Sequence, residues 1–191
     1  MIIHDLFIDF LLSDTIEYDY DKVLDYINNN KEHLADESIF SQRGGYQSKK
    51  LDWCRDVSNP AQDLVTLIVS KFNNVLAEKD LYQIRLHNYW ININYQHCYN
   101  TKHRHPGSQY GGVIYLKVPD DADSPITFHR DASHDDYHLS NTKMGPYLRC
   151  TSSYHPQKGL CLIFPAYIDH DVAANQSKEE RISISFNLGY A

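Results

Sequence analysis

Three histidines and one arginine in the second half of the chain have types and spacings that could do chemistry. His103 and His105 are two residues apart, and His170 follows about 65 residues later. Residues two apart on a β-strand point to the same face, so both imidazoles of the pair could reach one metal ion. Each signal alone is weak, because surface histidines usually bind nothing and a metal site needs several converging ligands.

The segment 181–188 alternates strictly between polar and apolar residues, which predicts a β-strand. Its polar face carries Arg181 and Ser183. Taken alone, the pattern is typical of an amphipathic strand with its polar face in water.

The first eighty residues are expected to be mainly helical. Apolar residues at helical spacing predict a helix within 19–34 and a longer one over about 61–79, with Pro60 suited to the first turn of the second. Residues 2–12 are expected to form a first strand or buried edge, and Gly44 with Gly45 marks a loop.

From residue 81 onward the sequence becomes rich in short β-segments separated by turn-forming residues. The expected strands are 82–96, 111–118, 125–129, 147–151, 160–164 and 181–188, and the polar stretch 130–146 is expected to be a long surface loop. Regular short strands of this kind predict a jelly roll. We therefore expect one domain over 1–191, in which an N-terminal helical part (1–80) supports a β core (81–191).

Composition limits the classes of partner. The chain has 191 residues and a net charge of -7 without any long Lys/Arg-rich run, so nucleic-acid binding is not expected. No apolar run reaches the roughly 18 residues that a membrane-spanning helix needs, and the N-terminus does not look like a signal peptide. The four cysteines show no zinc-type spacing, which favours a reducing cytoplasm, the host's cytoplasm if the protein is viral.

Taken in order, these motifs resemble the 2-oxoglutarate- and Fe(II)-dependent oxygenases. The pair His103-x-His105, the distal His170 and Arg181-x-Ser183 follow that superfamily's order and spacing. The segments WININYQHCYNTKHRHPGSQYGGVIYLKVP and GLCLIFPAYIDHDVAANQSKEERISISFN are similar to a subgroup of oxygenases from bacteria and their phages. The resemblance covers over half of the chain and implies a double-stranded β-helix, the cupin-like jelly roll.

The resemblance also implies cofactors and residue roles. His103, His105 and His170 would hold Fe(II), and 2-oxoglutarate would bind as co-substrate through Arg181, Ser183, Tyr115 and Asn94. The reaction would hydroxylate a small-molecule or peptide substrate and release succinate and CO2. The sequence departs from the wider superfamily at His105, where most members have a carboxylate ligand.

Several alternatives stay open at this stage. Residues expected to line a substrate pocket are Trp90, Tyr95, Tyr110 and Gln47, although buried aromatics more often belong to a core. Because His105 replaces a carboxylate, the chain could also be a three-histidine cupin-type dioxygenase or isomerase that does not use 2-oxoglutarate, or a non-catalytic jelly-roll binding module. A homodimer is expected from fold analogy alone.

Overall fold

Two α-helices and two antiparallel β-sheets make up the computed structural model, which describes residues 10–35, 41–54, 59–130 and 151–191. Helix α1 spans Tyr20–Leu34 and α2 spans Pro60–Glu78, which confirms both predicted helices. The side chain of Asn59 accepts a hydrogen bond from the backbone N–H of Gln62 at 2.9 Å. This cap and a proline at the first position explain why α2 begins at Pro60.

The larger sheet has seven strands in the order β1-β10-β7-β12-β5-β3, with β4 also paired to β5. Their bounds are β1 Leu12–Thr15, β3 Tyr46–Gln47, β4 Leu51–Asp52, β5 Ile84–Asn94, β7 Tyr110–Lys117, β10 Leu160–Pro165 and β12 Arg181–Tyr190. We call it the major sheet. Its centre is β12, which pairs along its length with β5 and β7.

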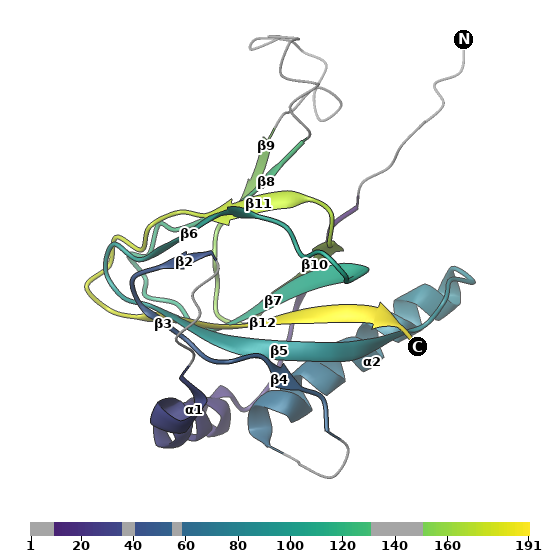
Figure 1. The fold of residues 1–191 in the computed structure, drawn as a ribbon, viewed down its shortest axis with the longest axis horizontal. Coiled ribbons are helices and arrows are strands. Elements are labelled where there is room, and N and C mark those ends of the chain that lie inside the picture. The colour runs from purple at the N-terminus through teal and green to yellow at the C-terminus, as the bar shows by residue number, and fades with distance from the viewer. Residues whose placement is uncertain (1–9, 36–40, 55–58, 131–150) are drawn as a thin grey trace, which may run out of the picture.

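The smaller sheet has five strands in the order β2-β6-β11-β8-β9, and we call it the minor sheet. Its strands are β2 Gln42–Arg43, β6 Tyr99–His103, β8 Ile126–His129, β9 Thr151–Tyr154 and β11 Asp169–Val172. The two sheets lie face to face, and both helices lie on the far side of the major sheet (Figure 1). This arrangement is the predicted double-stranded β-helix.

The main hydrophobic core lies between the major sheet and the helices. On β12 the side chains of Ile182, Ile184, Phe186 and Leu188 are fully or almost fully buried in this core. Phe186 lies so close to Gly112 on β7 that a Cβ at position 112 would come within 2.2 Å of its ring. A side chain larger than hydrogen at position 112 would therefore displace Phe186.

The strands predicted from 82–96, 111–118, 125–129, 160–164 and 181–188 are confirmed as β5, β7, β8, β10 and β12, with ends that differ by a few residues. The predicted strand 147–151 and loop 130–146 lie almost entirely outside the described residues, as do residues 2–9 of the predicted first strand. Besides the two helices, the N-terminal part contributes the short strands β1 to β4, which join both sheets.

Strands β2, β6 and β11 of the minor sheet were not among the predicted segments. All three are short and carry mainly charged or polar residues, so none shows a clear apolar period. Within the described part of the chain, no helix is long and apolar enough to cross a membrane.

Candidate functional site

The candidate site is a cavity of about 40 Å³ between the two sheets. The minor sheet side contributes His103, His105 and His170, and the major sheet contributes Arg181 and its polar neighbours. Among the described residues that line the cavity, none is aspartate or glutamate. The cavity thus joins three imidazoles and one guanidinium without a carboxylate beside them.

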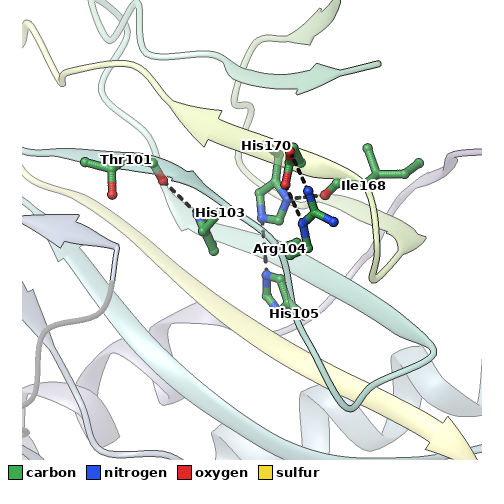
Figure 2. A network of polar contacts seen from close by, with 7 residues as sticks. Thr101, His103, Arg104, His105, Ile168 and His170 are labelled. Atoms are coloured by element: carbon green, nitrogen blue, oxygen red, sulfur yellow. Dashed lines mark hydrogen bonds and ion pairs between the residues drawn. The ribbon is translucent and has the colours of Figure 1, made fainter. Parts of the chain in front are cut away.

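The three histidines come together because β6 and β11 are neighbours in the minor sheet. The Cα atoms of His103 and His170 are direct cross-strand partners. The two histidines do not share a strand, because β6 ends at His103. His105 follows in a connecting segment, where its backbone N–H donates to the carbonyl of Ala166 at 2.9 Å, and its ring still points toward His170 (Figure 2).

Each imidazole uses Nδ1 for a hydrogen bond to the protein and leaves Nε2 for the cavity. His103 Nδ1 bonds the carbonyl oxygen of Thr101 at 2.8 Å, and His170 Nδ1 bonds that of Ile168 at 3.0 Å. His105 Nδ1 bonds the side-chain oxygen of Asn187 at 2.6 Å. Since a carbonyl oxygen can only accept, Nδ1 carries the proton in each ring and Nε2 offers a lone pair.

The Nε2 atoms converge closely enough to share one ion. Candidate ligand atoms of all three rings lie within 4.8 Å of one another, and Nε2 of His105 is 3.2 Å from Nε2 of His170. With both protons on Nδ1, two Nε2 lone pairs at that distance repel each other unless a cation lies between them. The donor set is therefore suited to a transition metal that accepts imidazole nitrogen.

Burial keeps these imidazoles uncharged. It lowers the pKa of His105 to about 4 and that of His170 to about 3, and the neighbouring imidazoles act in the same direction on His170. Burial also lowers the pKa of His103. At neutral pH all three rings are consequently neutral, which is the form that binds a metal ion.

The other end of the cavity is built around Arg181, whose side chain is almost completely buried. Its Nη1 donates to the carbonyl and to the hydroxyl of Ser124, at 2.9 and 2.6 Å. The guanidinium lies over the ring of Tyr115, 5.8 Å from its centroid. The buried Nε of Arg181 has no hydrogen-bond partner, so this end of the cavity offers a free donor and a positive charge.

The residues predicted to accompany Arg181 lie beside it. Ser183 is two residues further along β12, and Tyr115 is its cross-strand partner on β7. Asn94 ends β5 directly opposite Arg181. All three line the cavity and are almost completely buried.

Of the four residues predicted to line a substrate pocket, only Trp90 lines this cavity, where its ring stacks on His105 at 5.7 Å. Tyr110 packs against Phe72 of α2, because the even-numbered positions of β7 face the helices. Tyr95 follows the end of β5 and accepts a hydrogen bond from Lys31 at 2.6 Å. Gln47 pairs with Asn92 at the sheet edge without lining the cavity.

Asp169 is turned away from the histidines. Its carboxylate accepts two hydrogen bonds from Arg104, at 2.8 and 2.9 Å, and it does not line the cavity, because neighbouring strand residues point to opposite faces. The hydrogen bonds and charge of Arg104 hold the pKa of Asp169 below its usual value. Although it neighbours His170, Asp169 therefore does not replace the missing carboxylate ligand.

Among the residues that were not predicted from the sequence, Asn187 and Ser124 hydrogen-bond to His105 and Arg181. Asn187 contacts His105 and lies on the polar face of 181–188, so the alternation of that segment was a usable signal. Ser124 contacts Arg181 from the segment before β8. Nothing in the sequence indicated this contact, because no local pattern predicts a contact across 57 residues.

Comparisons with known proteins agree with this geometry. Residues 88–187, just over half of the chain, match the model of a family described as "Putative 2OG-Fe(II) oxygenase". A search of curated proteins found no match.

Many solved structures share the fold. A Pseudomonas putida prolyl-4-hydroxylase has 10% identity and a TM-score of 0.64, with 95% of this chain and 92% of that chain covered. A prolyl hydroxylase from Trichoplax adhaerens, in complex with a hypoxia inducible factor peptide, has 12% identity and the same TM-score, covering 95% and 82%. The epimerase SnoN, in complex with Fe3+, α-ketoglutarate and nogalamycin RO, has 18% identity and a TM-score of 0.62, covering 96% and 80%.

These likenesses show the double-stranded β-helix fold, and the family model adds the activity and the cofactors. The chain belongs to the family of 2-oxoglutarate- and Fe(II)-dependent oxygenases.

Proposed function

We propose that His103, His105 and His170 hold the iron of this oxygenase and that Arg181 binds the distal carboxylate of 2-oxoglutarate. The observation that carries the proposal is that both groups face one cavity from opposite sheets. An iron(II) chelate of 2-oxoglutarate needs a metal at one end of a short molecule and a cation at the other, and this cavity offers both.

The histidines fit iron, although the ligand set differs from the usual one. Non-haem iron(II) oxygenases typically use two histidines and one carboxylate. Here the third ligand is a neutral imidazole, so the metal centre carries one more positive charge than the usual site. The close lone pairs on His105 and His170 support a cation at this position.

Arg181 fits a carboxylate. A buried guanidinium requires a compensating anion, and the described residues that line its cavity include no acidic one. Its Nε is unpartnered, and the hydroxyl-bearing Ser183 and Tyr115 and the amide-bearing Asn94 line the same cavity. These side chains would orient the co-substrate, because a carboxylate accepts several hydrogen bonds at once.

When bound, iron supplies the oxygen chemistry, in which 2-oxoglutarate and O2 yield succinate and CO2 while the second oxygen atom enters a C–H bond of the substrate. The chain's own residues do the rest. The three Nδ1 hydrogen bonds fix the orientation of the imidazoles, and Trp90 and Phe164 cover the rings of His105 and His170 with apolar surface. This surface excludes water from the metal side of the cavity.

The deciding experiment measures Fe(II)-dependent conversion of 2-oxoglutarate to succinate without added substrate. Wild-type protein is reconstituted anaerobically, exposed to oxygen and compared with His103→Ala and Arg181→Ala. Arg104→Ala is the matched control, because Arg104 neighbours His103 but points outward to Asp169. We expect succinate from wild type and from Arg104→Ala, and background from the other two variants.

Binding measurements keep the test decisive when uncoupled turnover is slow. Wild type should bind one Mn(II) per chain and then 2-oxoglutarate. We expect His103→Ala to lose Mn(II) binding and Arg181→Ala to bind 2-oxoglutarate more weakly. A wild type that binds the metal but no 2-oxoglutarate would instead support a three-histidine dioxygenase or isomerase. Absence of both would contradict the proposal and favour a binding module.

We further propose that the prime substrate is a small molecule or a peptide, the two kinds bound by the solved neighbours SnoN and the Trichoplax enzyme. We propose that the protein is a single domain. We also place it in the cytoplasm, because the three cysteines among the described residues are unpaired, as is usual in a reducing compartment. A homodimer remains a proposal that light scattering would test.

A further inference from the structure

The three imidazoles differ in what holds them. His103 and His170 donate to backbone carbonyls two residues earlier in their own chain segment. His105 donates to a side chain, that of Asn187, which comes from β12 of the opposite sheet. A backbone carbonyl is present whatever the sequence, whereas this third partner depends on the residue at position 187.

The amide of Asn187 is itself oriented. Its Nδ2 donates to the side-chain oxygen of Asn88 on β5 at 3.0 Å, which leaves its oxygen for His105. Asn187 is 5% exposed and His105 is 9% exposed, so few water molecules compete for these groups. The chain Asn88–Asn187–His105 therefore fixes the proton of His105 on Nδ1.

This proton position matters because His105 has an alternative. Its Nε2 lies 3.2 Å from Nε2 of His170, which is a normal hydrogen-bond distance. If the proton of His105 moved to Nε2, the two rings would form a hydrogen bond with each other. His105 Nε2 would then donate a proton in place of offering a lone pair, His170 Nε2 would accept that hydrogen bond, and neither nitrogen would be free to bind a metal.

We propose that Asn187 is the positioning residue that makes His105 a metal ligand, by holding its Nδ1–H tautomer against a His105–His170 hydrogen bond. The inference rests on the proposed histidine triad. His105 stands where a carboxylate ligand is usual and brings no charge, so its orientation depends on this partner more than a charged ligand's would.

The first test compares Asn187→Leu, Asn187→Asp and wild type in the metal-free state. Nitrogen-15 NMR of the histidine side chains reports the tautomer directly. We expect the Nδ1–H form of His105 in wild type and in Asn187→Asp, because a carboxylate also accepts from Nδ1. In Asn187→Leu, whose side chain cannot accept, we expect the Nε2–H form.

The second test titrates the same proteins with Co(II) alone and follows its absorption spectrum. Asn187→Leu should bind about 10- to 100-fold more weakly than wild type, in line with the usual effect of removing a partner of a metal ligand. Asn187→Asp should bind at least as tightly as wild type, because an anionic partner makes the imidazole a stronger donor. Ser153→Ala on β9, whose hydroxyl contacts that of Thr127 outside the cavity, should bind within twofold of wild type.

Two results would overturn the inference. One is an Asn187→Leu protein that folds, keeps the Nδ1–H tautomer and binds Co(II) as wild type does. The other, which decides the matter if Asn187→Leu does not fold, is an Asn187→Asp protein that binds Co(II) more than tenfold more weakly. A wild type that binds no Co(II) contradicts the triad itself, while the metal-free tautomer still tests the role of Asn187.

Discussion

The two faces of the major sheet carry different kinds of residue on the same strands. On β12 the face toward the helices is apolar and fully packed, whereas the face toward the minor sheet carries Arg181, Ser183, Ser185 and Asn187. β5 alternates in the same way, with Ile91 and Ile93 toward the helices and Asn92 and Asn94 toward the cavity. One face therefore forms the hydrophobic core, and the other lines the candidate site.

The minor sheet repeats this division with fewer residues. Its inner face carries His103 and His170, and its outer face carries the exposed Arg104–Asp169 ion pair. Several buried polar atoms on the cavity side have no partner, including the side-chain oxygens of Asn92 and Asn94. Unsatisfied buried groups lower stability, so the cavity face is a place where function costs stability.

The largest expected effect is on the helix-facing side. Phe186→Ala removes a fully buried ring and should lower the free energy of unfolding by about 3–5 kcal/mol. Urea unfolding would measure the loss. Molecules that remain folded should still bind 2-oxoglutarate and Mn(II) with wild-type affinity. If this variant lost affinity without losing stability, the division between the two faces would be wrong.

The cavity face should make the metal-free protein sensitive to acid. Histidines of the unfolded chain protonate below the ordinary pKa of 6.5, whereas the folded His105 and His170 stay neutral until about pH 4 and 3. The unfolded state therefore binds more protons in this window, and stability is full above pH 6.5 and falls as the pH drops. For His105 alone the loss is on the order of 3 kcal/mol.

Urea unfolding in EDTA between pH 7.5 and pH 4 would measure this dependence. His105→Gln should show a shallower loss of stability, because it removes one of the titrating groups. Equal stability at pH 7 and at pH 4.5 would contradict the burial of neutral imidazoles.

Arg181→Lys should weaken 2-oxoglutarate binding while leaving the fold intact. Lysine keeps the charge but loses the planar fork, which costs about 1.5–3 kcal/mol, or about ten- to a hundredfold in affinity. Titration of the Mn(II)-loaded protein with 2-oxoglutarate would measure this change in affinity. Metal affinity itself serves as the internal control, and an unchanged 2-oxoglutarate affinity would place the carboxylate elsewhere.

The smallest effect is expected on the outer face of the minor sheet. Asp169→Asn breaks an exposed ion pair with Arg104, and such pairs contribute about 0–1 kcal/mol. Metal affinity and succinate formation should stay near wild type, although Asp169 is the direct neighbour of His170. A loss of metal affinity as large as the loss expected for His170→Ala would mean that Asp169 reaches the metal.

Much of the fold followed from the sequence because its signals are local. The apolar stripe of 61–79 and the alternation of 181–188 need no distant partner, and both predicted elements are present. The motif pattern also predicted that His103, His105, His170 and Arg181 lie together, and all four side chains line one cavity. The short strands β6 and β11 were missed because four or five polar residues have no readable period.

Alternation defines two faces of a strand, but it does not say which face another part of the chain will cover. The sequence by itself determined that Arg181 and Ser183 share a face, and that Tyr110 and Tyr115 lie on opposite faces of their strand. Only the tertiary structure decided that the polar face of β12 turns inward, that Tyr110 packs on α2, and that Asn187 meets His105. These contacts join residues far apart in the chain, so they depend on the register of sheets that assemble only when the whole domain folds.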